Sequence, residues 1–525
     1  MYELNVFRIP YYPGPDISAV GCIGLGGTME INNIEIIAAF VVYLSVMVTI
    51  GFLYYKKTTT VSDYILGGRG LNRYVTALSA EASDMSGWLL IGLPGLAYLT
   101  GMSAAWVALG LIIGTFLNWK FVAKRLRIYT QCANDSLTLP DFFRNRFEDK
   151  SDIIGGISAV FILIFFLIYT SAQFVAGGKL FNTVFGIDYT TALLLGSAIV
   201  VLYTFTGGFK AVCLTDFIQG CLMFFALLIV PIAALAILGG PGVVVSGIGD
   251  INPALLNPFL DPEGNPLTII AIASMLAWGL GYFGQPHILV RFMAIEKAEQ
   301  VREARTVAMV WVIVSLCAAV AIGIIGRVFL SQPLIGADSE TVFMVMTGDV
   351  LFPFLAGIVF CGILAAIMST ASSQLLVSAS AVSQDLYTSF FKQKATDREL
   401  IWISRISVLI VAVFAILLGL DPESFVFNIV SYAWAGFGAT FGPLLLMALF
   451  WKRTTRQGAL AGIVVGGLTV LLWKQVGLFG IYEIIPGFIL SLLAIYVVSK
   501  MTPPPADSIT QVFDETERIA KEFRN

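Results

Sequence analysis

Residues 82–88 (Ala-Ser-Asp-Met-Ser-Gly-Trp) place an acid, two hydroxyls and a glycine inside an apolar stretch that runs from about Tyr74 to Leu93. The stretch is long enough to cross a bilayer. An ionisable side chain at the centre of a membrane helix costs roughly 2.5–3.5 kcal/mol on insertion scales, so Asp84 should face the protein interior or a water-filled path. The stretch is therefore a candidate binding site.

A second interrupted stretch lies at residues 277–287, where three glycines and a proline should break helical hydrogen bonding. Free backbone groups in a membrane are tolerated only where protein or water satisfies them, and in transporters they line the site. Two broken spans predict an inverted-repeat secondary transporter that binds its ligands at mid-membrane. For either stretch alone the alternative is a packing kink, since Gly and Pro are common in membrane helices.

The composition is that of a polytopic membrane protein. Of 525 residues, 58% are hydrophobic and 12% charged, and the mean hydropathy is +0.86. The sole histidine, His287, rules out an HExxH zinc helix and a Ser-His-Asp triad, so we expect no enzyme. Six scattered cysteines suggest neither a disulfide framework nor a zinc site, and no GxxxxGK[ST] loop is present for ATP. A net charge of -3 gives no reason to expect a nucleic-acid partner.

Apolar segments of spanning length recur along the chain and predict an all-α protein with about thirteen transmembrane helices. An odd number of spans places the two termini on opposite sides of the membrane. The predicted spans are 34–54, 74–97, 103–122, 153–175, 189–206, 211–238, 268–290, 306–329, 343–380, 402–420, 425–450, 458–476 and 482–500.

Loop charges alternate in step with these spans. Lysines and arginines gather in alternate segments, among them 55–73, 123–152 and 291–305, where Arg291 is counted. The segments 239–267, 330–342 and 421–424 have none. The positive-inside rule then places the N-terminus outside and the C-terminus inside. We expect a multi-pass protein of the plasma membrane, as in a bacterial inner membrane.

The chain is predicted to divide into three regions. Residues 1–33 are predicted to be an extracellular extension, and residues 34–500 the transmembrane transporter domain. The outer segment 239–267 has no apolar run long enough to span. In the cytoplasmic tail, 501–525, apolar residues fall near one helical face and predict an amphipathic helix, with a partly disordered tail as the alternative. These apolar residues are Ile509, Val512, Phe513, Ile519 and Phe523.

Several motifs in this order resemble the solute:sodium symporter family, and within it the sodium/proline symporters. The resemblance extends from about Ile34 to Lys500 and rests on residues 62–69, 76–80, 82–88, 138–141, 279–287, 368–370 and 431–438. It implies the leucine-transporter fold, with two five-helix inverted repeats, here about 74–238 and 268–420, plus flanking helices. It also implies a symporter that imports L-proline with sodium by alternating access.

The same resemblance implies a sodium ion between the first broken span and the span at 343–380. Sodium is a hard cation that prefers oxygen ligands. The matching positions supply backbone carbonyls and hydroxyls: Ala82, Met85, Ala366, Ser369 and Thr370. Without the resemblance, the two hydroxyls would be expected to bond back to their own helix. Asp84 is expected to add negative charge that favours the cation.

For the substrate, the resemblance points to residues of both broken spans and of the span at 153–175. Half-helix ends and backbone N–H groups suit a carboxylate, and aromatic faces suit both an apolar ring and a cation. Any single aromatic residue could instead be structural. The implied substrate residues are Ser86, Gly87, Trp88, Tyr169, Trp278, Tyr282, Gln285 and Pro286.

Three further residues, which join Ser369 above, and two modulators complete the expectations. Asp216, with Ser369, Ser372 and Ser373, could frame a second sodium site, as in some members of the family. Glu81 stands where the proline symporters carry a small residue, three positions before Asp84. It is either protonated, paired with a base, or turned toward water. Gln173, one turn beyond Tyr169, could also adjust the substrate site.

The alternatives differ in cargo and in class. Within the family, the solute could be another amino acid, a carboxylate or a sugar. From other classes, a receptor or a channel could reuse the fold, although a tail of about 25 residues is too short for a signalling domain. The expected partners are sodium, a small solute and the lipid bilayer; the oligomeric state is left open.

Overall fold

A computed structural model describes residues 34–55, 60–206, 208–391 and 395–522. Within these ranges the regular structure is helical, with two isolated β-bridges, Leu71 with Ile295 and Leu260 with Pro266. The predicted extension 1–33 and the tail residue Phe523 lie outside the described residues.

Helix boundaries follow from local chemistry. Asn72 caps α3 (Arg73–Asp84), where its side chain accepts hydrogen bonds from the backbone N–H groups of Tyr74 and Val75. Thr138 caps α7 (Leu139–Arg146) in the same way, with a proline in the first turn. The long helix α10 (Phe209–Leu238) ends at Gly239, whose φ of 91° lies in the left-handed region that favours glycine.

The first half of the chain contributes the helices around the first broken span. They are α1 (Ile34–Tyr55), α2 (Val61–Leu66), α3, the π-helix η2 (Trp88–Gly92), α4 (Leu93–Thr100), α5 (Ala105–Leu117), the π-helix η4 (Asn118–Ala123), α6 (Lys124–Cys132), α7, α8 (Ile153–Phe185), α9 (Tyr189–Thr206), α10 and α11 (Pro241–Ile251).

The second half supplies the helices around the second broken span and the C-terminal helices. They are α12 (Ile269–Leu276), the 3-10 helix η6 (Ala277–Gly284), α13 (Pro286–Ala294), α14 (Val301–Phe329), the 3-10 helix η8 (Gly336–Thr341), α15 (Val342–Val350), α16 (Pro353–Ser380), the π-helix η9 (Ala381–Tyr387), α18 (Asp397–Leu418), α19 (Val426–Phe450), α20 (Arg456–Val476), α21 (Ile484–Met501) and α22 (Asp507–Glu522).

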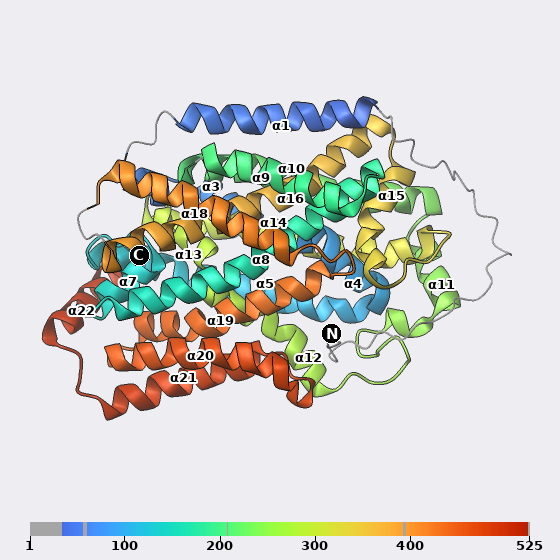
Figure 1. The fold of residues 1–525 in the computed structure, drawn as a ribbon. Coiled ribbons are helices and arrows are strands. Elements are labelled where there is room, and N and C mark those ends of the chain that lie inside the picture. Colours follow the sequence, from blue (N-terminus) through green and yellow to red (C-terminus); the bar gives the residue numbers. More distant parts are fainter. Residues whose placement is uncertain (1–33, 56–59, 207, 392–394, 523–525) are drawn as a thin grey trace.

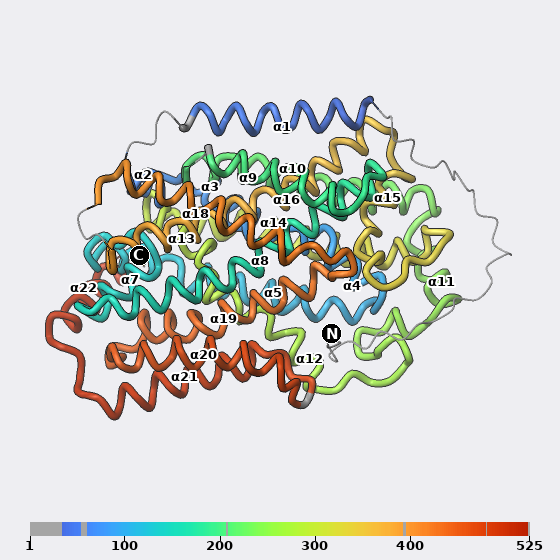
Figure 2. The backbone as a smooth tube through the Cα atoms, viewed as in Figure 1, coloured from blue at the N-terminus to red at the C-terminus, as the bar shows by residue number. Residues whose placement is uncertain are grey.

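The long helices run roughly side by side in one bundle (Figure 1). α1 lies along one edge, and α20 and α21 lie along the opposite edge, as the tube in Figure 2 also shows. Between them, α3 packs on α10, α14 and α16, while η6 packs on α5 and α19. The broken spans therefore lie in the interior of the bundle, where neighbouring helices can satisfy their free backbone groups.

Ten helices of the described residues are long and apolar enough to cross a membrane, and the bent pair α12–η6 with α13 would make eleven. The predicted number of thirteen therefore stays a prediction. The predicted span 343–380 is wrong as one helix, because the chain breaks before Pro353, which begins α16. Proline lacks the N–H that a continuous helix would need at that point. The segment 239–267, which was predicted to lie outside, contains the helix α11, which sequence reasoning did not foresee.

The segments rich in lysine and arginine meet at one end of the bundle. Leu71 pairs with Ile295, the Arg69 guanidinium donates to the carbonyl of Met293 at 2.7 Å, and the Arg127 guanidinium donates to that of Ile295 at 2.7 Å. α7 and α22 lie at this end, whereas α11 and α15 lie at the other (Figure 1). The alternation of loop charge thus corresponds to two ends of the folded molecule.

The predicted tail helix is present as α22, and it docks on the protein. Phe513 is 4% exposed, and its ring lies 5.0 Å from the Arg125 guanidinium and 5.5 Å from that of Arg146. Asp514 pairs with Lys452 at 2.6 Å. The apolar face of this helix therefore packs against α6 and its neighbours.

Candidate functional site

The first broken span changes direction at Met85. α3 ends at Asp84, and Met85 has a ψ of 70°, outside the helical range. Its N–H still bonds the carbonyl of Glu81 at 2.7 Å, and the N–H of Ser86 folds back onto the carbonyl of Asp84 at 2.8 Å. The chain then resumes as the π-helix η2. Met85 and Ser86 are therefore an unwound, buried linker between two helices, and Gly87, whose φ and ψ are helical, is the N-cap of η2.

One side of this linker faces α16. The Ser369 hydroxyl donates to the carbonyl of Ala82 at 2.7 Å and lies 3.2 Å from that of Ala366, and the Thr370 hydroxyl lies 3.4 Å from Ala82 O. All four residues are fully buried, as is Met85. The structure thus brings together, from helices almost 290 positions apart, oxygens of four of the five residues that the family resemblance implied for sodium: Ala82, Ala366, Ser369 and Thr370.

Asp84 joins the two broken spans. One of its carboxylate oxygens accepts a 2.6 Å hydrogen bond from the Tyr282 hydroxyl of η6. Its backbone carbonyl accepts the indole N–H of Trp88 at 3.2 Å and the Tyr169 hydroxyl of α8 at 3.4 Å. Three of the predicted substrate residues therefore meet around this one acid.

Gln173 holds the unwound linker. Its amide oxygen accepts the Gly87 N–H at 3.0 Å, and its amide nitrogen donates to the Ser86 hydroxyl at 3.2 Å. A Cβ added to Gly87 would lie 2.8 Å from the Cβ of Ala176, so a side chain larger than glycine has no room there. The residue expected to adjust the substrate site is in direct contact with it.

Aromatic rings cover one side of these groups. Trp278 lies 5.8 Å from Trp88 by ring centroids, and it stacks on Phe427 at 4.9 Å and on Tyr482 at 5.9 Å. The indole of Trp434 donates to the carbonyl of Trp278 at 2.7 Å. Sequence reasoning did not single out Phe427, Trp434 or Tyr482, although Trp434 lies in one of the family-like motifs.

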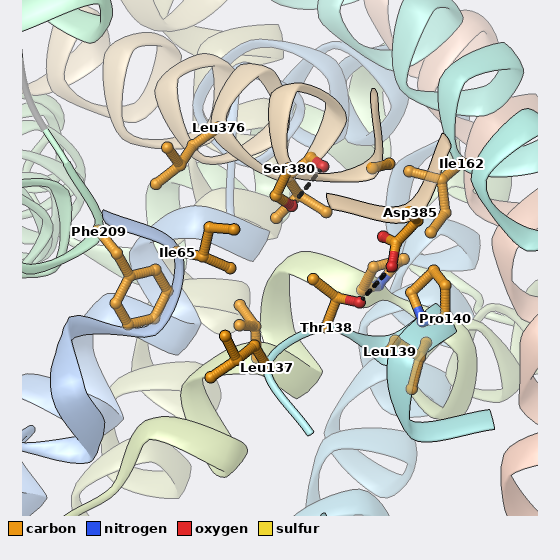
Figure 3. Close-up of a pocket in the computed structure, with 14 residues that line it drawn as sticks. Ile65, Leu137, Thr138, Leu139, Pro140, Ile162, Phe209, Leu376, Ser380 and Asp385 are labelled. Atoms are coloured by element: carbon orange, nitrogen blue, oxygen red, sulfur yellow. Dashed lines mark hydrogen bonds between the residues drawn. The ribbon is translucent and has the colours of Figure 1, made fainter. Parts of the chain in front are cut away.

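Gln285 and Pro286 contact other groups. The Gln285 amide donates to the carbonyls of Gly281 and Trp434, which places it against α19. Pro286 lines a separate cavity of about 20 Å³ toward the end of the bundle where α7 lies. Figure 3 shows this cavity, with the Thr138 hydroxyl bonded to Asp385 at 2.8 Å across its rim.

Asp216 has a partner of its own. The guanidinium of Arg291 donates to the carboxylate of Asp216 at 3.0 Å, to the hydroxyl of Ser373 at 2.5 Å and to that of Ser79 at 3.0 Å. Arg291, counted as a cytoplasmic loop residue, in fact lies in α13 and is 1% exposed. A sodium ion between Asp216 and Ser373 would have to displace this guanidinium, so that second site stays a prediction.

Ser372, the remaining residue of that set, donates its hydroxyl to the carbonyl of Ser369 at 3.1 Å. It therefore bonds back to its own helix, as membrane serines commonly do.

Glu81 is buried, with 2% of its surface exposed. One carboxylate oxygen accepts the indole N–H of Trp119 at 2.9 Å, and no basic side chain of the described residues pairs with the other. Of the three expectations for Glu81, a base partner and exposure to water are both wrong, and the protonated carboxyl stays a prediction.

A buried ion pair connects three elements at the end of the bundle opposite α7. Lys179 of α8 bonds the Glu340 carboxylate of η8 at 2.6 Å, and the same carboxylate accepts the N–H groups of Val426 and Phe427 at 3.0 Å each. Negative charge suits these N–H groups because they begin α19. Nothing in the local sequence identifies this pairing.

Comparison with known proteins places these features in context. The family model for the sodium:solute symporter family matches residues 64–466. The osmoregulated proline transporter OpuE of Bacillus subtilis is 49% identical over 493 residues, covering 93% of this chain and 99% of the relative. The sodium/proline symporter of Escherichia coli K12 is 47% identical over 488 residues, covering 92% of this chain and 96% of the relative.

Solved structures resemble the fold. A Na+-coupled sialic acid symporter in a substrate-bound outward-open state matches with a TM-score of 0.74 at 18% identity, over 90% of this chain and 99% of that one. The nucleobase-cation-symport-1 family transporter Mhp1, in a closed conformation, matches with a TM-score of 0.52 at 13% identity. The match covers 86% of this chain and 98% of Mhp1. The bundle is therefore the leucine-transporter fold predicted from the sequence.

Proposed function

The chain belongs to the sodium:solute symporter family, and on that premise we propose that it imports L-proline together with sodium across the bacterial plasma membrane. Relatives named as proline transporters or sodium/proline symporters, at 47–49% identity over most of both chains, support proline as the solute. The observation that carries the mechanism is the break at Met85 and Ser86, because the stretch 82–88 around it contacts α16 on one side and the aromatic groups on the other.

The first sodium ion would bind where Ala82, Met85, Ala366, Ser369 and Thr370 converge. These groups offer three carbonyl and two hydroxyl oxygens, and hard cations prefer such ligands. The Ser369 hydroxyl, which now donates to Ala82 O at 2.7 Å, would turn its hydrogen away and present a lone pair instead. Asp84, on the same segment, would add the negative charge that favours a cation.

Proline would bind on the other side of the linker, among Ser86, Gly87, Trp88, Tyr169, Trp278 and Tyr282. Its carboxylate would accept the N–H of Gly87 in place of the Gln173 amide oxygen, which now holds that donor at 3.0 Å. The faces of Trp88 and Trp278 suit the apolar ring and the ring ammonium. Because one unwound segment serves both ligands, binding of either one would order it for the other. Gln285 and Pro286 would act from the cytoplasmic side of this site.

The ion gradient supplies the driving force. One sodium ion moving down roughly 100 mV gains about 2.3 kcal/mol. A tenfold gradient adds about 1.4 kcal/mol. At one-to-one coupling the sum of about 3.7 kcal/mol supports roughly 500-fold accumulation. This chemistry makes and breaks no covalent bond, so the chain acts as a transporter and not as an enzyme.

The proposed orientation follows from the charged end of the bundle. Segments 55–73, 123–152 and 291–305 and the helix α22 would lie in the cytoplasm, and α11 and η8 outside. The inverted repeats would be 74–238 and 268–420, which places α3 and η6, the broken elements, at equivalent positions in opposite directions.

The test is uptake of radiolabelled proline by the full chain reconstituted in proteoliposomes. We expect saturable uptake that requires an inward sodium gradient and is competed by unlabelled proline better than by other amino acids, carboxylates or sugars. Asp84→Ala should abolish sodium-driven uptake, since it removes the acceptor of the Tyr282 hydroxyl. Ser246→Ala, on the exposed face of α11, is the control. Coupled uptake retained in Asp84→Ala, or conductance without saturation, would contradict the proposal.

A further inference from the structure

Four buried oxygen atoms without a hydrogen-bond donor lie in the seam between α3, α5 with η4, and η6. They belong to Glu81, Asp84, Thr115 and Asn118, each at most 2% exposed. We refer to these four residues with Tyr282 as the Glu81 cluster. Buried polar atoms are nearly always satisfied, so four orphaned oxygens in one seam need an explanation.

Hydrogen bonds around the cluster hold these side chains together. The indole N–H of Trp119, next to Asn118, donates to Glu81, and the Tyr282 hydroxyl donates to Asp84. The Asn118 amide donates to the carbonyl of Tyr282 at 3.1 Å, and the Thr115 side chain lies next to the Tyr282 hydroxyl. η4 also packs directly on η6. The two carboxylates of α3 therefore face the stretch 115–119 and Tyr282.

This face of α3 is distinct from the one that meets α16. Glu81 and Asp84 are three positions apart and share one face, whereas Ala82 and Met85 share the next. The carbonyl of Ala82 bonds Ser369, while Glu81 bonds Trp119 on the other side of the helix. A ligand in the Glu81 cluster would therefore not compete for the groups that hold the first sodium ion.

The cluster is short of positive charge. The donors that reach its carboxylates, Trp119 and Tyr282, are neutral, and in the described ranges no lysine, arginine or histidine bonds either acid. Two other buried acids have a base, since Asp216 pairs with Arg291 and Glu340 with Lys179. Asp385 is also buried and accepts the Thr138 hydroxyl, but it is a single carboxylate and not one of two that share a helix face. An uncompensated buried carboxylate costs several kcal/mol, so each of the two must be neutralised, either by a proton or by a metal cation.

We propose that the Glu81 cluster binds a second sodium ion, held by the Glu81 and Asp84 carboxylates, the Thr115 hydroxyl and the Asn118 amide oxygen. The donor set is oxygen alone, which matches a hard monovalent cation. The inference rests on the proposed sodium-coupled import and deepens it, because two sodium ions would then move with each proline. Asp84, placed between both ions, would link them.

The experiment measures sodium per proline in proteoliposomes with a tenfold inward sodium gradient and the membrane potential clamped at zero. Wild type should accumulate proline about 100-fold, since two ions contribute the square of a single tenfold gradient. Its sodium dependence should show a Hill coefficient approaching two. Glu81→Gln should accumulate proline about 10-fold with a Hill coefficient near one, and Thr115→Val should raise the sodium concentration for half-maximal uptake.

Glu81→Gln is a conservative probe. Its amide oxygen can still accept the Trp119 N–H, and its NH₂ group supplies donors to the oxygens that the ion would otherwise satisfy. A second readout needs no transport: equilibrium binding of ²²Na⁺ to the purified full chain should fall from two ions to one. Ser369→Ala, which alters the other site, should weaken binding of the other ion about tenfold, and the double variant should show both changes.

Particular outcomes would overturn the inference. One bound sodium in both wild type and Glu81→Gln would refute it. So would one sodium and one proton moved per proline, since a proton would then neutralise the cluster. Failure of the proposed function looks different, because wild type would then show no sodium-driven proline uptake while the folded protein could still be assayed for ²²Na⁺ binding.

Discussion

The buried ion pair between Lys179 and Glu340 leads to a prediction about how the transporter closes on its outer side. Glu340 of η8 bonds Lys179 of α8 and the first N–H groups of α19, at 2.6–3.0 Å. Lys179→Met removes the cation and leaves a buried carboxylate with only two backbone donors. Breaking a buried pair from one side costs about 3–5 kcal/mol. If these contacts form only when the outer side is closed, about 3 kcal/mol shifts the equilibrium toward the open state by about 100-fold.

The assay is the reaction of a reporter cysteine with a membrane-impermeant maleimide added outside. Phe427 is a suitable position, because its side chain is 6% exposed and stacks on Trp278 beneath the pair. In a background without native cysteines, Lys179→Met should speed labelling of Phe427→Cys at least tenfold and reduce proline accumulation. Lys179→Arg keeps the charge, so its labelling rate and its proline accumulation should remain near those of the parent.

Removal of both partners provides the critical comparison. Glu340→Gln keeps an acceptor for the α19 N–H groups but carries no charge, so the double variant with Lys179→Met leaves no unpaired ion. Its labelling rate should return toward that of the parent. Equal labelling rates in Lys179→Met and the parent would refute the role of the pair in closure. So would a double variant that is labelled faster than either single variant.

Three further outcomes are expected. Ser369→Ala should raise the sodium concentration for half-maximal uptake about tenfold, because it removes the hydroxyl that now bonds Ala82 O; an unchanged sodium dependence would remove Ser369 from the site. Gln173→Leu should lower stability without proline by about 1–3 kcal/mol, as the Gly87 N–H loses its acceptor, and proline should restore more stability than in wild type; thermal unfolding with and without proline measures both. Replacing sodium with choline should lower the melting temperature, since an ion at 100 times its dissociation constant stabilises by about 2.7 kcal/mol.

The sequence located the broken spans because glycine, proline and a single acid are costly inside an apolar helix. Ala82 and Ser369, assigned to sodium by family resemblance, are indeed in contact across two helices. Contacts between distant segments were harder to predict from the sequence. Arg291 was taken for a loop residue because it follows an apolar run, yet it pairs with Asp216, 75 positions earlier in the chain.

Two other features were not predicted from the sequence: the hydrogen-bond partner of Glu81 and the residue at which α16 begins. Position 81 was recognised as unusual, but only the fold shows that Trp119 is its sole hydrogen-bond donor among the described residues. The break before Pro353 was missed, although Gly348, Asp349 and Pro353 mark it in the sequence, because the residues on both sides are apolar enough to span. Apolar composition reports burial in lipid or protein, and it does not report the path of the backbone.

The docking of α22 has a consequence for biosynthesis. Arg146 is 2% exposed, and rings of Tyr129, Phe147 and Phe513 surround its guanidinium at 5.1–5.5 Å. Phe513 follows Arg146 by 367 positions in the chain, so it is synthesised much later. The guanidinium therefore emerges from the ribosome only partly covered, and it stays so until α22 has been synthesised and docks. A nascent chain stalled before α22 would present an incomplete surface that chaperones and proteases could recognise.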